Sequence, residues 1–204
     1  SFDNRNAIPV FDGDKVYMLL RFHPNIYLAV LEGGIDQLLN PSMYRESWEK
    51  IYQQRDENLL IETGTYPHEK EKVGAGIPLI ETERGWLCIY HAVGYISEDI
   101  CKVYGLKGEI KRAYSVGAAV LDLDNPKKVL CKAKNPIYIP SMPYELEGNE
   151  QYPIDVPNVV FPVGGIVRNN KLLLYCGAGD KYTALLSCDI NKLIDYMFEN
   201  CGVI

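Results

Sequence analysis

Four side chains in this acidic sequence could bind an anion together. Arg5, Arg21 and Lys72 are basic, and His91 is one of only three histidines in the chain. Arginine offers a rigid fork of donors that fits phosphate or carboxylate, and lysine adds a point charge. These residue types therefore favour recognition of a phosphate or carboxylate group. The competing interpretation is that each cation is a surface group with a local acidic partner, and for Lys72 the charged run HEKEKVG supports it.

Other catalytic signatures are missing from the sequence. The Gly-Ala-Gly at 74–76 is not followed by G-K-[ST] and does not complete G-x-G-x-x-G, and no G-x-S-x-G elbow appears. There is no H-E-x-x-H, and separated histidines without a cysteine pair argue against a structural zinc site. Asp122, Glu145 and Asp155 are among many carboxylates, but no pattern pairs two of them across a substrate as ordinary glycoside hydrolysis requires. We expect no metal and no cofactor.

The composition limits the class of protein. The chain has 204 residues, enough for one large domain or two small ones, and its net charge of −6 is spread along its length. A general nucleic-acid binder would carry a basic footprint, which is not seen. The sequence has no run of about 18 apolar residues, so it predicts no membrane span. The N-terminus shows no basic segment followed by an apolar one, as a signal peptide would have.

The cysteine pattern predicts free thiols. No two cysteines form a C-x-x-C pair, and most lie inside apolar, strand-like runs, which is typical of small buried side chains in a reducing compartment. We therefore expect a cytoplasmic protein without a disulfide framework. The six cysteines are Cys88, Cys101, Cys131, Cys176, Cys188 and Cys201.

Most of the chain alternates between runs of Val, Ile, Leu and Tyr and turns rich in Gly, Asn, Asp and Pro, which predicts an all-β fold. Residues 47–60 could form a short helix. The clearest helix lies in 189–202, where Asp189 is the expected N-cap and Gly202 the expected stop. The expected buried face of that helix consists of Ile190, Leu193, Ile194, Met197 and Cys201.

The strands repeat three times, in 12–38, 83–130 and 168–193. Each copy has a turn, an apolar strand with a polar tip, a second strand and an acidic turn, and Tyr27, Tyr114 and Tyr182 fall in equivalent places. Several copies of a small antiparallel sheet predict a β-propeller, whose blades pack face to face around an axial channel. The competing interpretation is a β-sandwich with coincidental similarity.

The repeat also suggests where the polar residues meet. The strand tips read LLR, IYH and YCGAGD, so that Arg21, His91 and Asp180 hold equivalent positions in the three copies. In a propeller, strands near the axis carry their ends to the mouth of the channel, where these residues would converge. A single histidine on an apolar strand is more often a core residue, but three polar tips at equivalent positions favour a pocket.

Four segments together resemble one family. KVGAGIPLIETERGWLCIYHAV, YSVGAAVLDLDNPKKVL, NVVFPVGGIV and LLLYCGAGD are similar to segments of glycoside hydrolase family 130, and they occur in that family's order. The match runs from about Asp3 to the C-terminal helix. The family comprises five-bladed β-propellers that act as β-mannoside phosphorylases, together with some β-mannosidases.

The resemblance implies inverting phosphorolysis. A β-linked mannosyl unit of an oligosaccharide or disaccharide would be transferred to inorganic phosphate, the co-substrate, giving α-mannose 1-phosphate. Two alternatives stay open: a β-mannosidase that uses water, with acidic residues in place of the cations, and a non-catalytic propeller that binds carbohydrate. As partners we expect the β-mannoside and phosphate, neither nucleic acid nor membrane, and we leave a homo-oligomer open.

Four positions match the family's phosphate pocket. Arg5 in NRNAIP is similar to its first arginine, and Arg21, which ends KVYMLLR, is similar to its second. Lys72 in KVGAG and His91 in IYH match its lysine and histidine. Retention of these cations favours a phosphorylase. Two departures are a slightly short segment between the arginines and Tyr-His-Ala where the family usually has Tyr-His-Gly.

The resemblance also assigns sugar contacts. Asn6 and Asp180 are similar to positions that contact the sugar, and Tyr114 is expected to line the same pocket. The insertion 94–112 could shape the side of the site that holds the acceptor sugar, form an oligomer contact, or be a solvated hairpin.

The family's proton donor has no counterpart in this chain. That aspartate should lie before the Arg-Asn segment, and Asp3 is too near Arg5 to take its place. We therefore expect the general acid N-terminal to Ser1 and assign no catalytic residue here. Three repeats cannot close a five-bladed ring, so we expect residues 1–204 to be a partial propeller domain, roughly its C-terminal three blades plus a helix.

Overall fold

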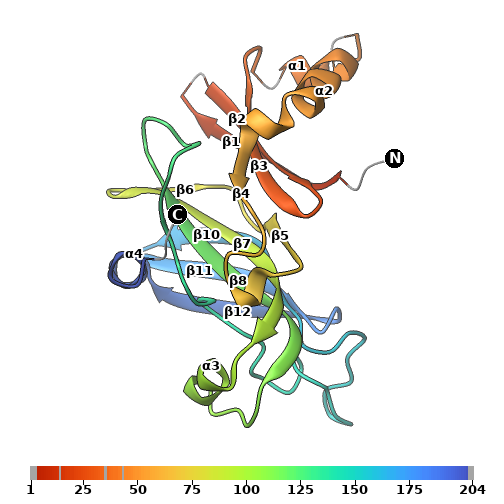
Figure 1. Cartoon of the computed structure of the whole chain (residues 1–204), viewed down its shortest axis with the longest axis vertical. Coiled ribbons are helices and arrows are strands. Elements are labelled where there is room, and N and C mark those ends of the chain that lie inside the picture. The colour runs from red at the N-terminus through yellow and green to blue at the C-terminus, as the bar shows by residue number, and fades with distance from the viewer. Residues whose placement is uncertain (1–3, 14, 35, 43, 202–204) are drawn as a thin grey trace.

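The computed structural model describes residues 4–13, 15–34, 36–42 and 44–201. Within them the chain forms three antiparallel sheets packed one behind another (Figure 1). The first sheet contains β1 (Asn4–Asp12), β2 (Lys15–Phe22), β3 (Asn25–Leu31) and β4 (Leu59–Ile61). The second contains β5 (Lys72–Ala75), β6 (Ile80–Thr82), β7 (Gly85–Ile96), β8 (Ile110–Leu121) and β9 (Val129–Lys132). The third contains β10 (Val160–Arg168), β11 (Lys171–Ala178) and β12 (Tyr182–Asp189).

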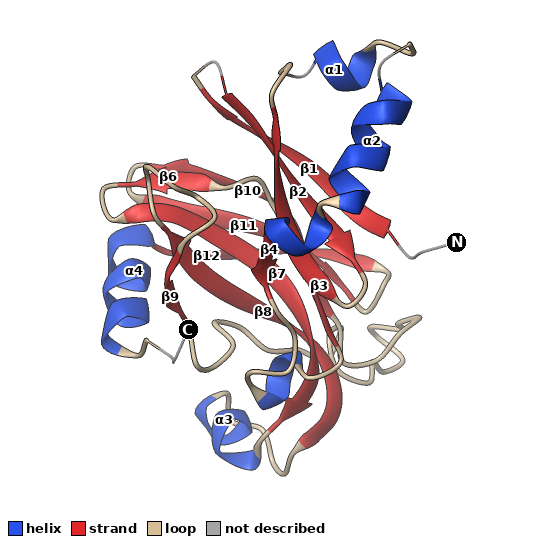
Figure 2. Ribbon diagram, turned by 45° about the horizontal axis from the view of Figure 1, so that its top comes forward, coloured by secondary structure: helices blue, strands red, loops and turns tan. Residues whose placement is uncertain are grey.

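Helices lie at the margins of these sheets (Figure 2). The four α-helices are α1 (Asp36–Leu39), α2 (Tyr44–Gln53), α3 (Glu98–Val103) and α4 (Ile190–Glu199). Two short 3₁₀ turns are η1 (Arg55–Asn58) and η2 (Pro67–Glu69). None of the helices in the described residues is long and apolar enough to cross a membrane. The predicted all-β fold with a C-terminal helix is confirmed.

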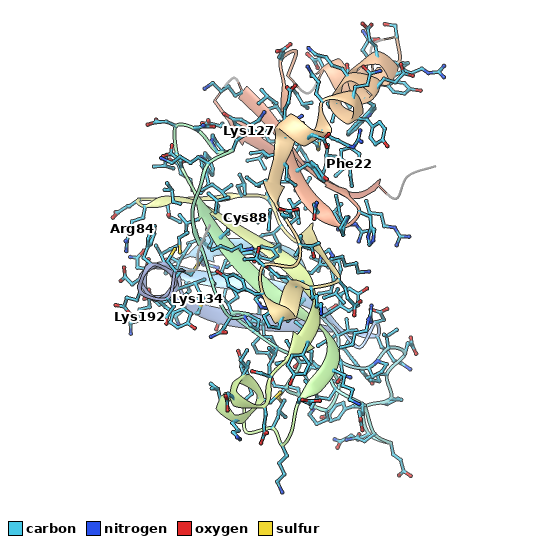
Figure 3. All side chains as sticks on the ribbon, in the orientation of Figure 1. Phe22, Arg84, Cys88, Lys127, Lys134 and Lys192 are labelled. Carbon is cyan, nitrogen blue, oxygen red and sulfur yellow. The ribbon has the colours of Figure 1, made fainter. Side chains whose placement is uncertain are left out.

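Two apolar layers hold the sheets together. Leu19 and Leu28 of the first sheet pack with Cys88 and Tyr90 of the second, and Cys88 is labelled at the centre of Figure 3. On the other side of the second sheet, a separate cluster joins Ile89 and other residues of β7 and β8 to β10, β11 and α4. The second sheet is therefore covered on both faces, and this explains why β7 is buried along almost its whole length.

The region predicted as a helix at 47–60 divides into three elements. Helix α2 covers the outer face of the first sheet, where Ile51 is buried and Tyr52 meets Phe22 edge to face. The helix ends before 60 because the chain returns to the sheet: Leu59 pairs with Tyr27, and β4 becomes the fourth strand. Tertiary pairing thus shortens the predicted helix.

Helix α4 has the predicted beginning and the predicted buried face. The Asp189 carboxylate accepts a hydrogen bond from the Lys192 backbone N–H at 3.0 Å, as an N-cap does. Ile190, Ile194 and Met197 are buried against the third sheet, and Leu193 and Cys201 pack partly buried beside them. Gly202, the expected stop, lies outside the described residues.

The insertion 94–112 differs from a plain solvated hairpin. It continues β7 and β8 beyond the body of the second sheet and carries α3 between them, at the bottom of Figure 1. Ser97 caps α3, and Cys101 is buried with Ile96, Ala113 and Ile139. A small apolar core therefore fixes the insertion in place.

The thiols are free, as predicted. Burial is complete for Cys88, Cys101, Cys131 and Cys176, whereas Cys201 is half-buried and Cys188 is exposed. Burial raises the pKa of Cys88 and Cys176 to about 12, so these thiols are inert at neutral pH. The expectation of buried thiols is wrong for Cys188: it lies opposite the buried Leu172, but β12 is the edge strand of the third sheet, and the thiol there is exposed.

Removal of the α4 cap should destabilise the protein. Asp189→Ala removes the acceptor for the Lys192 N–H, and we expect the free energy of unfolding to fall by about 1 kcal/mol. Asp189→Asn, which keeps an acceptor oxygen, should stay close to the unmodified protein. Urea denaturation measures both, and equal stability of Asp189→Ala and the unmodified protein would contradict the assigned cap.

Candidate functional site

The first strand of each sheet contributes to one polar site. β1, β5 and β10 each lie at an edge of their sheet. β1 and β10 pair along the whole of β2 and β11, and β5 pairs with the middle of β7. Arg5 is opposite Arg21 in the first sheet, and Gly74 is opposite His91 in the second. In the third sheet, β10 begins beside the end of β11. Residues far apart in the sequence therefore meet where the three sheets adjoin.

His91 lies at the centre of this site. Its ring is completely buried and stacks on Phe161 of the third sheet, with 4.2 Å between ring centroids. The ring of Tyr114 lies 6.1 Å away on the neighbouring strand. Neither ring nitrogen of His91 has a hydrogen-bond partner within the described chain. Buried polar atoms are nearly always paired, so these two nitrogens indicate a place for a ligand or water.

Gly74 makes the close packing around His91 possible. A Cβ atom at this position would lie 2.4 Å from His91 Cε1 and 3.0 Å from Arg21 Cδ. Arg21 comes from the first sheet and is only 4% exposed. Because Gly74 has no side chain, the stem of Arg21 from the first sheet and the imidazole of His91 from the second sheet can lie close together.

Lys72 adds a second cation beside the same rings. Its Nζ lies 5.0 Å from the centroid of the Tyr114 ring, a cation–π distance. In the described residues, no carboxylate lies within ion-pair distance of Lys72; the adjacent Glu71 instead accepts from Arg112 Nε at 2.9 Å. The local acidic partner that the competing interpretation required for Lys72 is therefore not found in this part of the chain.

The charge state of His91 follows from its surroundings. Burial, and then the positive charges of Arg21 and Lys72, lower the pKa of His91 from 6.5 to about 3. The imidazole is therefore neutral at neutral pH, with one N–H donor and one acceptor nitrogen. A neutral ring between cations favours an anionic ligand, which would bring acceptor oxygens to all three side chains.

The other predicted site residues lie around this centre. Arg5 is exposed on β1. Asn6 is half-buried with a φ of 58°, at the register irregularity that follows Arg5. Asp180 is exposed, with a φ of 54°, in the turn after β11, near the strand end where Gly177 pairs with Phe161. The structure thus brings Arg21, Lys72, His91 and Tyr114 into contact, and it places Arg5, Asn6 and Asp180 on the strands or turns next to them.

Two features of the site were not predicted. Phe161 stacks on His91, although the sequence analysis used its segment only as a resemblance. Arg112 approaches Tyr114, with its Cζ 5.5 Å from the ring centroid, and it also pairs with Glu71, the residue that precedes β5. Arg112 and Tyr114 are two residues apart on β8, so strand alternation places them on the same face. This spacing is the only sequence signal that could have indicated their contact.

The abundant carboxylates do not form a second site. Glu145 is fully buried, and its carboxylate accepts from the Tyr138 hydroxyl and from the backbone N–H groups of Ser141 and Met142. Those contacts fold the loop between β9 and β10. In the described residues no group of His, Cys, Asp and Glu side chains is arranged to hold a metal ion.

A cavity of about 610 Å³ lies along the insertion, and none of Arg21, Lys72, His91 and Tyr114 lines it. It lies between the insertion and the loop that precedes β10, and it is lined by Lys107, Lys111, Glu147 and Asn158 among others. The Asn158 carbonyl accepts from the backbone N–H of Tyr114 at 2.9 Å, which ties the cavity wall to the anion site. Polar groups at the rim and apolar groups such as Leu106 and Leu146 suit a sugar surface.

The fold and the site define an all-β protein in which two cations lie close to a buried, neutral imidazole. The family model Glyco_hydro_130, described as beta-1,4-mannooligosaccharide phosphorylase, matches residues 2–199. The chain therefore belongs to glycoside hydrolase family 130.

Individual relatives agree with this family. The chain is 35% identical over 166 residues to a 1,2-beta-oligomannan phosphorylase of Thermoanaerobacter sp. (strain X514), covering 81% of this chain and 43% of that protein. It is 31% identical over 137 residues to a beta-1,4-mannooligosaccharide phosphorylase of Ruminococcus albus, covering 66% and 36% respectively. The chain thus spans less than half the length of these relatives.

A solved structure shows the same fold. The beta-1,2-mannobiose phosphorylase of Listeria innocua, in complex with beta-1,2-mannobiose, superimposes with a TM-score of 0.69. The two chains are 23% identical, and the match covers 97% of this chain and 47% of the other. At this identity the likeness concerns the arrangement of the sheets.

Substitution of Gly74 should disrupt the site. Gly74→Ala places a Cβ atom 2.4 Å from His91 Cε1, so the imidazole must move away from Arg21. We expect the affinity of the intact protein for inorganic phosphate to fall at least about tenfold, since charge-assisted contacts depend on geometry. Isothermal titration calorimetry measures it, and unchanged phosphate affinity in a folded variant would contradict the assigned packing.

Two buried histidines should make stability depend on pH. The pKa of His91 is about 3 and that of His68 about 4, both below the 6.5 of an unfolded chain. Between pH 6.5 and 4 the unfolded state binds more protons, so stability is complete above pH 6.5 and is lost as the pH falls. Each histidine contributes at most about 1.4 kcal/mol per pH unit. Urea denaturation across this window should show a shallower dependence for His91→Gln, and an unchanged slope would count against a neutral His91.

Proposed function

We propose that this chain is part of a mannoside phosphorylase, which transfers a β-linked mannosyl unit to inorganic phosphate with inversion, giving α-mannose 1-phosphate. The observation that carries the proposal is the cluster of buried Arg21 and His91 with half-buried Lys72, in which neither imidazole nitrogen has a hydrogen-bond partner within the described residues. The printed names of the curated relatives, which are mannoside phosphorylases, support the same activity.

The proposed roles follow from charge. Arg21 and Lys72 hold the phosphate oxygens, with Arg5 as a third cation on the neighbouring strand. The neutral His91 donates one N–H to the phosphate. A hydrolase would need to place water here, and two cations with a buried imidazole suit an anionic nucleophile better than a neutral one. We therefore favour the phosphorylase over the β-mannosidase.

The sugar would lie above the phosphate. Tyr114 offers an aromatic ring beside Lys72, and Asn6 and Asp180 offer polar atoms from the first and third sheets. The cavity between the insertion and the loop before β10 would receive the acceptor sugar, because Asn158 in its wall is hydrogen-bonded to the backbone of Tyr114. No other ligand or cofactor is required by these roles.

In the proposed reaction, a phosphate oxygen forms a bond to the anomeric carbon while the bond from that carbon to the acceptor oxygen breaks. The acceptor oxygen takes a proton from a general acid that we place on a segment preceding these residues. Because phosphate attacks from the face opposite the leaving group, the product has the inverted configuration. In this step the residues named here bind and orient phosphate, and none of them donates or accepts the transferred proton.

We further propose that the three sheets are the C-terminal blades of a five-bladed propeller. The relatives are more than twice as long as the matched region. The third sheet also has an open apolar face, on which Val163 is 59%, Ile166 53% and Leu185 54% exposed. An apolar face of this kind would be covered by a neighbouring blade in a closed ring.

Phosphate dependence tests the proposed activity. The intact protein, including any segment that precedes these residues, is incubated with β-1,2- and β-1,4-mannobiose and with mannosyl-glucose, with and without inorganic phosphate. We expect mannose 1-phosphate only when phosphate is present. Arg21→Met and Lys72→Met should raise the KM for phosphate at least about tenfold, because each removes one charged contact.

Other outcomes would select the alternatives. Free mannose released equally with and without phosphate would establish the β-mannosidase and contradict the assigned role of the cations. Carbohydrate binding without turnover of any of these substrates would favour the non-catalytic propeller.

A further inference from the structure

A second buried charged cluster lies directly behind the phosphate pocket. It consists of Glu69 on η2, Lys132 on β9 and Tyr90 on β7, and we call it the rear cluster. Lys132 Nζ is 2.6 Å from Glu69 Oε1, and the Tyr90 hydroxyl donates to Glu69 Oε2 at 3.1 Å. The Glu69 side chain is fully buried and that of Lys132 is 8% exposed.

The rear cluster and the pocket occupy opposite faces of β7. Successive side chains on a strand point to opposite faces, so Tyr90 and His91 project in opposite directions. Tyr90 packs in the apolar layer between the first and second sheets, whereas His91 stacks on Phe161 of the third sheet. Within the described residues the hydrogen bonds and ion pair of the rear cluster join its own members, so its effect on the pocket would pass through the backbone.

The first connection leads to Lys72. Glu69 precedes Lys72 by three residues, and β5, which begins at Lys72, is only four residues long. The backbone on both sides of Lys72 is hydrogen-bonded, from the Glu71 N–H to the Val93 carbonyl and from the Val73 N–H to the Pro24 carbonyl, both at 2.9 Å. The backbone of Glu69 is itself fixed, because its carbonyl accepts from the Gly64 N–H at 3.1 Å and from the Thr63 hydroxyl. Anchoring Glu69 therefore fixes the start of β5.

The second connection leads to His91. Tyr90 is the immediate neighbour of His91. The Tyr90 ring lies against Gly117 of β8, where a Cβ atom on Gly117 would be only 2.3 Å from Cε2 of the ring. The ring is thus pressed against the backbone of β8, while its hydroxyl is held by Glu69. One carboxylate accordingly fixes both the strand that carries His91 and the segment that carries Lys72.

Stability alone does not account for this cluster. A buried ion pair often gives no more stability than well-packed apolar residues of similar size, because both charges must be removed from water. The same pair gives geometric specificity, since Lys132 and the Tyr90 hydroxyl can satisfy the carboxylate in only one arrangement. That arrangement sets the spacing between Lys72 and His91.

We propose that Glu69, Lys132 and Tyr90 are positioning residues for the phosphate pocket, acting through the backbone of η2, β5 and β7. The inference rests on the proposed function, in which Lys72 and His91 bind phosphate. The rear cluster determines the affinity for phosphate and has no part in binding the mannoside. Its loss should therefore change the KM for phosphate and leave the KM for the mannoside unchanged.

Two tyrosine variants of the intact protein provide a matched comparison. Tyr90→Phe and Tyr138→Phe each remove one phenol that donates to a buried carboxylate, Glu69 in the first case and Glu145 in the second. We expect Tyr90→Phe to raise the Kd and KM for phosphate about three- to tenfold, and Tyr138→Phe to change them less than twofold. The KM for mannobiose should stay within twofold in both variants.

The charged pair gives a stronger version of the same test. Lys132→Met should raise the Kd for inorganic phosphate more than tenfold, and Glu69→Ala should do the same. Glu69→Gln keeps one acceptor oxygen, which can serve Lys132 or the Tyr90 hydroxyl but not both, so it should recover only part of the affinity that Glu69→Ala loses. Thermal unfolding of each variant identifies those that do not fold, and Tyr90→Phe keeps the proposal testable if the charged variants fail.

Calorimetric phosphate binding separates this inference from the proposed function. A protein that binds phosphate with the expected differences but forms no mannose 1-phosphate would overturn the function and support the positioning role. Phosphate affinity that is unchanged in Tyr90→Phe and Lys132→Met would overturn the positioning role. An equal rise in the KM values for phosphate and mannobiose, or an equal effect of Tyr138→Phe, would also overturn it.

Discussion

A buried imidazole held between two cations is the constraint on which the rest of this structure depends. His91 is neutral because burial and the charges of Arg21 and Lys72 lower its pKa to about 3. Bringing like charges together away from water costs free energy, and neither ring nitrogen has a hydrogen-bond partner within the described residues. The cost must be offset by packing elsewhere. The two apolar layers on either side of the second sheet provide that packing.

The sheets serve this site in different ways. The first sheet contributes Arg21, the second contributes Lys72 and His91, and the third contributes Phe161 as a stacking surface. Each position depends on a backbone that can approach closely, most clearly at Gly74. The rear cluster then supplies a fixed reference on the opposite face of β7. Binding residues on strands, supported from behind by buried polar contacts, are held more precisely than residues on loops.

Part of this arrangement could be predicted from the sequence. Arg21 and His91 were expected to converge as the tips of equivalent strands. The structure places them together against Gly74, although His91 lies in the middle of β7 and not at its end. Helix α4 could be predicted because its N-cap and apolar period are local. The stacking of Phe161 on His91 and the pairing of Glu69 with Lys132 join residues 70 and 63 positions apart. No local pattern encodes such contacts, and the charged run around Glu69 even suggested a solvated surface.

A crystal structure of the intact protein with inorganic phosphate would test the central claim most directly. The account predicts one phosphate ion with its oxygens within hydrogen-bond distance of a nitrogen of His91, Lys72 Nζ and the Arg21 guanidinium. It also predicts that the ring of His91 remains stacked on Phe161. Phosphate bound elsewhere, with the nitrogens of His91 paired to a side chain of the protein, would contradict it.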